Sequence, residues 1–247
     1  MTAPSARLTS GVPHDAGRAR CTRYGVNENS ASLPERSSPL PLAREGYPLI
    51  MGVVGVTALL YLIGWTIPSL LGVVLCVFVI QFFRDPEREV PQQPGLIVSP
   101  ADGRVIKVAR VQDDRFLNAE VQMISIFMSP LSVHVNRIPC RGRVLDVRYN
   151  PGKYFRAFAD KASLDNEQNA VVLEDEQGRR IAFVQIAGFV ARRIVCHLRG
   201  GMNVERGVRY GMIMFGSRAD IYLPLDAKVR VAVGDRTRGA STVLAEW

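Results

Sequence analysis

The chain has 247 residues and a formal net charge of +8, with 31 Lys and Arg against 23 Asp and Glu. This length holds one sizeable domain with appendages, and the basic balance calls for an acidic partner, usually nucleic acid or an anionic membrane surface. Nucleic acid is disfavoured, because the basic residues are scattered, aromatic residues make up only 8% of the chain and no nucleic-acid-binding motif occurs.

The first 46 residues form a basic segment rich in Ser, Pro, Arg and Ala, without apolar periodicity. Such a composition cannot bury enough apolar surface to fold, so we expect residues 1–46 to be a disordered tail. No apolar core of a secretion signal occurs within the first thirty residues.

Residues 47–83 are almost purely apolar. A single helix of that length would measure on the order of 50 Å, against a bilayer core of about 30 Å. Gly64 and Pro68 interrupt the run near its middle, so we predict two helices that form a membrane-associated hairpin, either spanning or re-entrant. Arg44 before the run and Arg84 and Arg88 after it place both ends on the cytoplasmic face.

From residue 84 to residue 247 the sequence consists of short segments rich in Val and Ile, separated at regular intervals by turn residues. This pattern is typical of an all-β barrel or sandwich rather than of alternating βαβ units. One helical stretch is expected around Tyr154–Ala162, where β-branched residues are fewer. The predicted fold is therefore a mainly β, barrel- or sandwich-like catalytic domain (84–247) preceded by the helical hairpin (47–83).

Four polar patches interrupt this β pattern. They are Ser99-Pro-Ala-Asp-Gly-Arg104, a block around His134, the polar run Asp160–Asn169, and Tyr210-Gly-Met-Ile-Met-Phe-Gly-Ser-Arg218. Taken singly, each has an ordinary structural explanation: a turn in which Gly103 supplies an unusual backbone angle, a buried structural histidine, a solvated loop, and a Gly-Ser turn after a strand. The three histidines and four cysteines are too dispersed to predict a metal site.

Taken together and in this order, the patches resemble the phosphatidylserine decarboxylase family, in its short prokaryotic branch. The matching runs are FRDPERE, SPADGRV, ISIFMSPLSVHVNRIP, DKAS followed by NEQN, QIAG followed by ARRIVC, and MFGSRADIYLP. The resemblance covers roughly residues 82–225 and leaves out the N-terminal tail. Six ordered blocks make chance agreement very improbable, although a Gly-Ser dipeptide alone is common.

The resemblance implies that the chain is a proenzyme that makes its own cofactor. The hydroxyl group of Ser217 would attack the carbonyl of Gly216, and elimination would then separate a β chain (1–216) from an α chain (217–247) that begins with a pyruvoyl group. The two chains would remain together as a heterodimer. The pyruvoyl group would form a Schiff base with the amine of phosphatidylserine in the membrane and promote its decarboxylation to phosphatidylethanolamine. Neither a metal nor an external cofactor is implied.

The resemblance also implies roles for two further residues. A serine hydroxyl needs a base that removes its proton, and His134 matches the family's histidine block. Asp102, in the SPADG turn, matches the aspartate that orients such a histidine, so that Asp102, His134 and Ser217 form a triad used on the chain itself. Longer bacterial relatives often carry a second histidine where this chain has Arg137, which leaves open whether His134 serves both cleavage and decarboxylation.

Two alternatives remain open at this point. A decarboxylase of another serine phospholipid would have much the same sequence. A non-catalytic binding module of the same fold would also contain SPADGRV-like turns, and it would be recognised as a chain that stays intact.

Overall fold

The computed structural model describes residues 41–152, 166–188, 193–214 and 217–247. The helices are a 3-10 turn (Arg44–Gly46), α1 (Tyr47–Leu62) and α2 (Thr66–Phe82). The strands are β1 (Leu96–Val98), β2 (Gly103–Asp113), β3 (Ala119–Met128), β4 (Val135–Arg137), β5 (Gly142–Asn150), β6 (Gln168–Glu174), β7 (Arg180–Ala187), β8 (Arg193–Cys196), β9 (Asn203–Val204), β10 (Arg209–Met214), β11 (Ser217–Pro224), β12 (Lys228–Val229), β13 (Arg236–Thr237) and β14 (Val243–Glu246). The predicted fold class, mainly β, is confirmed. The helix expected at Tyr154–Ala162 lies outside the described residues.

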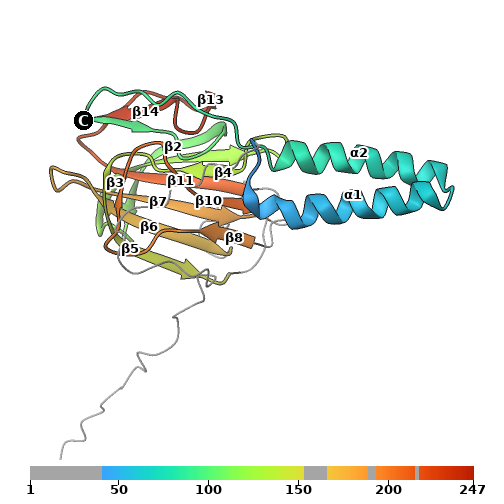
Figure 1. Ribbon diagram of the computed structural model, residues 1–247. Coiled ribbons are helices and arrows are strands. Elements are labelled where there is room, and N and C mark those ends of the chain that lie inside the picture. The colour runs from blue at the N-terminus through green and yellow to red at the C-terminus, as the bar shows by residue number, and fades with distance from the viewer. Residues whose placement is uncertain (1–40, 153–165, 189–192, 215–216) are drawn as a thin grey trace, which may run out of the picture.

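The strands of the described part of the chain form one large and two small antiparallel sheets. The large sheet is curled and has the order β13-β2-β3-β11-β7-β6-β5-β9. The small sheets have the orders β4-β10-β8 and β1-β14-β12. Figure 1 shows the helical hairpin extending from one end of this β-domain, with the C-terminus at the opposite end.

The central strands read as continuous apolar runs because both of their faces are buried. On β3, Ile124 and Ile126 point into the main core, whereas Val121 and Met123 belong to a second cluster on the other face. Strand β7 follows the same rule, with its alternate residues divided between the two clusters. Alternation of side chains along a strand produces this division.

The apolar run forms two helices, broken where Gly64 adopts a φ of +83°. Pro68 does not break the run. It falls in the first turn of α2, where a missing backbone N–H is tolerated. The helices approach closely at Gly72, where an added Cβ would lie 2.5 Å from Thr57 Oγ1. By length and composition the described residues contain one helix able to cross a membrane (Arg44–Leu62), followed by the shorter apolar helix α2.

Most of the large apolar side chains that the described chain exposes lie on this hairpin. Met51, Tyr61 and Ile67, for example, are 69–74% exposed. At its base the hairpin becomes part of the protein core, because Phe82 and Phe83 are buried in a cluster with Val135 of β4 and Met212 of β10. The hairpin is therefore anchored to the small sheet β4-β10-β8.

Candidate active site

Ser217 is the first residue of β11, a central strand of the large sheet. It pairs with Met128 of β3 on one side and with Ala187 of β7 on the other. Its side chain is fully buried, and its hydroxyl donates to Met128 Sδ at 3.4 Å. Gly216, the other half of the predicted cleavage site, lies outside the described residues. Ser217 therefore lies on the face of the sheet that packs against the main core, because Ala219 and Ile221, at alternate positions after it, belong to that core. The serine lies at the end of the sheet where Asn136 of β4 contacts Met128.

His134 directly precedes β4 and is fully buried. Its Nδ1 lies 2.9 Å from the carbonyl oxygen of Ser132, and its ring stacks on Phe82 with 4.1 Å between the ring centroids. Because a carbonyl oxygen only accepts hydrogen bonds, Nδ1 carries the proton and Nε2 keeps a lone pair. Nε2 is buried and has no hydrogen-bond partner among the described residues.

Burial lowers the pKa of His134 to about 4, from 6.5 for an exposed imidazole. The hydrogen bond to Ser132 opposes this shift in pKa, and the nearby positive charge of Arg84 adds to it. A neutral imidazole with a free Nε2 is the form of histidine that can act as a general base.

Asp102 lies in the turn before β2, and its carboxylate is held by two donors. Arg88 Nη2 donates to Oδ2 at 2.7 Å, and the backbone N–H of Gly239 donates to Oδ1 at 2.7 Å. Gly103, the first residue of β2, follows Asp102 and is not among the glycines with positive φ. Glycine is required there for a different reason than the predicted backbone angle, since an added Cβ would lie 2.2 Å from the backbone oxygen of Phe127.

No hydrogen bond joins Asp102, His134 and Ser217 within the described residues; two indirect links bring their segments together. Pro100, in the turn that carries Asp102, accepts a hydrogen bond from the backbone N–H of Arg137 at 2.9 Å. Asn136 Nδ2 and Ser217 Oγ both lie within hydrogen-bonding distance of Met128 Sδ, at 3.9 and 3.4 Å. Strand β4 thus contacts both the SPADG turn and the neighbour of Ser217.

Arg84 and Arg88, which the sequence interpretation used only as indicators of membrane orientation, also interact with the candidate site residues; both lie in the quoted run FRDPERE. Burial lowers the pKa of Arg84, and the Asp102 carboxylate opposes this shift; the positive charge of Arg84 in turn helps to lower the pKa of His134. Arg88 forms an ion pair with Asp102 in which both side chains are about 15% exposed. The order of motifs along the chain gives no signal for these contacts.

Arg137 lies three residues after His134 and is part of a buried ion cluster together with Asp85 and Arg209. Arg137 Nη2 lies 2.7 Å from Asp85 Oδ1, and Arg209 Nε contacts the other carboxylate oxygen of Asp85. Arg137 also donates to the backbone oxygens of Pro86 and Gly207. The cluster ties the end of the hairpin to β4 and β10.

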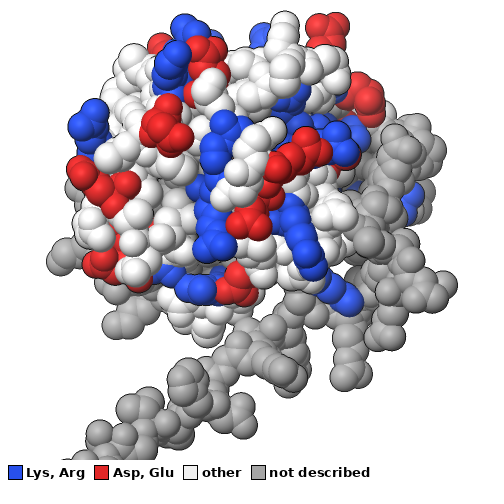
Figure 2. All heavy atoms as spheres, turned by 90° about the vertical axis from the view of Figure 1, so that its left-hand side faces the viewer, with Lys and Arg blue, Asp and Glu red and all other residues white. Residues whose placement is uncertain are grey.

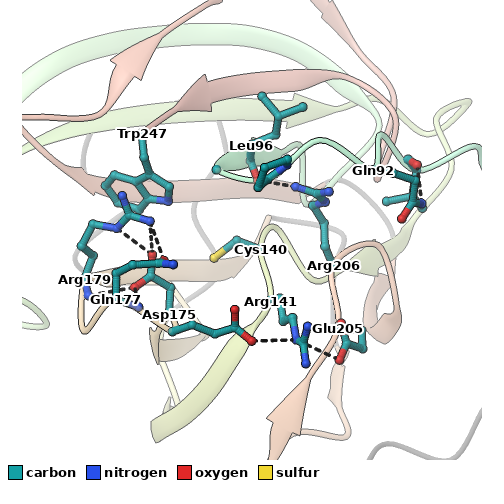
Figure 3. A pocket seen from close by; sticks show the side chains of 14 residues that line it. Gln92, Leu96, Cys140, Arg141, Asp175, Gln177, Arg179, Glu205, Arg206 and Trp247 are labelled. Atoms are coloured by element: carbon teal, nitrogen blue, oxygen red, sulfur yellow. Dashed lines mark hydrogen bonds and ion pairs between the residues drawn. The ribbon is translucent and has the colours of Figure 1, made fainter.

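A cavity of about 310 Å³ opens at the other end of the β-domain, beside the C-terminal Trp247. Figure 3 shows its charged side chains engaged with one another: Arg179 pairs with Asp175 at 2.7 Å and stacks on Trp247, and Arg141 contacts Glu205. The surface at this end carries both signs of charge (Figure 2). None of the predicted site residues lines this cavity.

Within the described residues, no group of three or more His, Cys, Asp or Glu side chains is placed to hold a metal ion. The candidate site consists instead of the buried Ser217 hydroxyl on a central strand, the neutral buried imidazole of His134 directly before β4, and the Asp102 carboxylate in the turn before β2. Together with the apolar hairpin, these features describe a mainly β domain in which Ser217, His134 and Asp102 are the candidate site residues.

Comparison with known proteins identifies its family. The family model described as "Phosphatidylserine decarboxylase" matches residues 75–245. A relative from Ralstonia nicotianae, named phosphatidylserine decarboxylase proenzyme, is 48% identical over 208 residues, which are 83% of this chain and 95% of the relative. Relatives with the same name from Neisseria meningitidis serogroup C and Cupriavidus taiwanensis are 48% and 46% identical; the matches cover 85% and 84% of this chain and 79% and 97% of those relatives. The chain belongs to the phosphatidylserine decarboxylase family and is a decarboxylase.

Proposed function

We propose that this protein decarboxylates phosphatidylserine to phosphatidylethanolamine after cutting itself between Gly216 and Ser217. The name shared by its relatives supports both the substrate and a processed precursor. The observation that carries the proposal is the buried Ser217 at the start of β11, together with a buried histidine before β4 whose Nε2 has no partner among the described residues.

In the cleavage step, His134 takes the proton of the Ser217 hydroxyl through Nε2 as the oxygen attacks the Gly216 carbonyl. An ester forms as the peptide bond breaks, and elimination then releases residues 1–216. Asp102 stabilises the positive charge that His134 gains when it takes the proton. We assign Arg88 the role of fixing the orientation of the Asp102 carboxylate. The residue left at position 217 is a dehydroalanine, which gains water and loses ammonia to become a pyruvoyl group.

The surroundings of Ser217 fit a pyruvoyl group. Residue 217 pairs with β3 on one side of its strand and with β7 on the other, so a group made from it stays anchored. The α chain (217–247) supplies β11 to the centre of the large sheet, which supports a stable heterodimer with the β chain. When present, the pyruvoyl group supplies the electron sink for the carbon–carbon bond that breaks. The residues of the chain bind the headgroup, exclude water and move protons.

We place the protein at the cytoplasmic face of the cell membrane. The exposed apolar hairpin supports this location, because large apolar patches on a protein surface mark membrane or protein contacts. Leu131 is 65% exposed and lies beside the hairpin base, where Arg84 donates to its backbone oxygen. The hairpin extends from one end of the β-domain (Figure 1), and His134 stacks on Phe82 at its base, so an inserted hairpin would hold this part of the site near the lipid headgroups.

The test is the intact mass of the purified protein beside Ser217→Ala. Two fragments that meet at Gly216 and Ser217 are expected for the wild type, with the smaller one blocked to N-terminal sequencing, and one intact chain is expected for the variant. Release of carbon dioxide from phosphatidylserine in vesicles then confirms the substrate. A folded wild-type chain that stays intact in lipid would rule the proposal out.

A further inference from the structure

Three buried side-chain atoms of the described residues have no hydrogen-bond partner: His134 Nε2, Glu167 Oε2 and Gln168 Oε1. The first already has a place in the proposed cleavage. Glu167 is only 4% exposed, and a buried carboxylate without a full set of donors is energetically unfavourable. Such an exception calls for an explanation, and ligand binding is one that can be tested.

Glu167 directly precedes β6, and the register of β6 and β7, continued by one residue, places it on the same side of the large sheet as Ser217. The backbone N–H of Ala187 donates to the Glu167 carbonyl at 2.9 Å, next to the pair formed by Gln168 and Ile186. Ala187 in turn pairs with Ser217. Residues directly opposite each other in an antiparallel sheet point to the same face, so Glu167, Ala187 and Ser217 form one row. Their backbones span two strand spacings, about 10 Å.

The middle residue of this row leaves space between the other two. Ala187 carries only a methyl group and belongs to the main core. Gln168 is the next residue along the chain and pairs with Ile186, which belongs to the cluster on the other face of the sheet. The two unpartnered oxygens of Glu167 and Gln168 are therefore on opposite faces, and only that of Glu167 is on the face of Ser217.

The chemistry of Glu167 favours a cation. The Tyr149 hydroxyl donates to Oε1 at 2.8 Å and holds the carboxylate in place, while Oε2 has no donor. Within the described residues, no Lys, Arg or His forms an ion pair with Glu167. A buried carboxylate is stabilised by an opposite charge that brings its own N–H donors.

We propose that Glu167 Oε2 binds the ammonium group of the serine headgroup, and so selects an amino-bearing phospholipid. This inference rests on the proposed function. Of the three charged groups of that headgroup, the ammonium is the only cation, and its nitrogen must reach the carbonyl made from Ser217. Before that nitrogen can react it gives up one proton, and Oε2 can accept it, which converts the ion pair into a neutral amine and a carboxylic acid.

The test is a binding measurement on enzyme that has cleaved but cannot react. Treating the processed protein with borohydride reduces the pyruvoyl ketone to an alcohol, and titration calorimetry then gives the Kd of dihexanoyl phosphatidylserine. A charge-assisted hydrogen bond contributes about 1.5–3 kcal/mol, so Glu167→Gln should raise this Kd by about 10- to 100-fold. Glu167→Gln keeps the side-chain shape and an oxygen that can accept from Tyr149.

Gln168→Leu is the matched control, because it alters the neighbouring buried side chain on the other face; its Kd should equal that of the wild type. A second arm changes the ligand instead of the protein. A dihexanoyl lipid with a 3-hydroxypropionate headgroup lacks only the amino group, and wild-type enzyme should bind it about 10- to 100-fold more weakly than dihexanoyl phosphatidylserine.

Equal affinity of the wild type for the two lipids would overturn the inference, even if Glu167→Gln failed to fold or to cleave. An unchanged Kd in a cleaved Glu167→Gln enzyme would overturn it as well. Both results would leave the proposed function standing, provided that the wild type cleaves and releases carbon dioxide. A wild-type chain that never cleaves would instead contradict the proposed function.

Discussion

The short strand β4 carries one group of buried polar side chains and directly follows another, and the two differ in whether their polar atoms have partners. In the buried ion cluster, Asp85 places one carboxylate oxygen on Arg137 and the other on Arg209. One residue before β4, His134 keeps a buried nitrogen without a partner among the described residues. We call the first group complete, because both carboxylate oxygens of Asp85 are paired, and the second incomplete, because its buried nitrogen has no partner within the described part of the chain.

The comparison separates the residues that stabilise the fold from those that we expect to take part in the reaction. A satisfied ion cluster fixes the hairpin to the β-domain and has no capacity left for a ligand. Unsatisfied buried atoms weaken the folded state, so their presence near Ser217 is expected where a substrate or a reacting hydroxyl completes the hydrogen bonds. Changes in the incomplete group should therefore alter reaction rates, and changes in the complete group should alter stability.

The largest effect is expected from His134→Gln. Loss of the general base should slow self-cleavage by about 10²- to 10⁴-fold, since positioned proton acceptors contribute factors of this size. The rate is measured as the appearance of the α chain after synthesis of the precursor. His197→Gln is the control, because His197 pairs with Glu45 at the hairpin base and should cleave at the wild-type rate. Rapid cleavage by His134→Gln would remove His134 from the mechanism.

The ion cluster should respond in stability instead. Asp85→Ala leaves Arg137 buried without its carboxylate, and breaking a buried pair in this way is worth about 3–5 kcal/mol. Urea denaturation in detergent measures this change, with both variants made in the Ser217→Ala chain so that a single intact species unfolds. Glu87→Ala is the matched control, because Glu87 is 91% exposed although it also pairs with Arg209. Similar losses in both variants would contradict the comparison.

The low pKa of His134, about 4, predicts an unusual pH profile for cleavage. The neutral form is the base, so the cleavage rate should stay level from pH 8 to about pH 5 and fall only as the pH passes through about 4. Phe82→Leu removes the ring that stacks on the imidazole and so reduces its burial. The pH at which the cleavage rate falls to half should then move up toward 6.5. A wild-type midpoint near 6.5 would show that His134 is solvated before cleavage.

The same lowered pKa affects stability, and its sign follows from the proton uptake of the two states. Between pH 6.5 and about 4 the unfolded chain binds the proton and the folded chain does not, so the folded state loses stability as the pH falls through this range. The difference between the two pKa values corresponds to about 3 kcal/mol. In the Ser217→Ala chain, replacing His134 by Gln should remove this part of the acid sensitivity.

A smaller effect is expected for Arg88→Met, which removes one of the two donors to Asp102. The backbone N–H of Gly239 still holds the other oxygen, so we expect cleavage to slow by only about fivefold, or about 1 kcal/mol. Arg104→Met, at an exposed arginine two residues after Asp102, should leave the rate unchanged. An equal slowing in both variants would mean that net charge, and not the contact with Asp102, sets the rate.

The sequence predicted features that depend on local pattern. The break at Gly64, the β-rich domain and the position of Ser217 after an apolar run all follow from periodicity and turn residues. The roles of Ser217, His134 and Asp102 stay predictions that the experiments above address. The pairing of Asp85 with Arg137 joins residues 52 positions apart, and the alignment of Glu167 with Ser217 depends on strand register. Neither leaves a local pattern in the sequence.

The smallest effect is expected at the far end of the molecule. Arg141 contacts Glu176 and Glu205 in the cavity beside Trp247, but its side chain is 62% exposed. Water solvates these charges nearly as well as the ion pairs do, so Arg141→Ala should change the free energy of unfolding by less than about 1 kcal/mol and leave cleavage unchanged. Denaturation and cleavage assays on this variant set the baseline against which Asp85→Ala is judged. A large loss of activity in Arg141→Ala would show that this cavity is coupled to the site at Ser217. The comparison between the ion cluster and the incomplete group would then have to include the cavity as a third region.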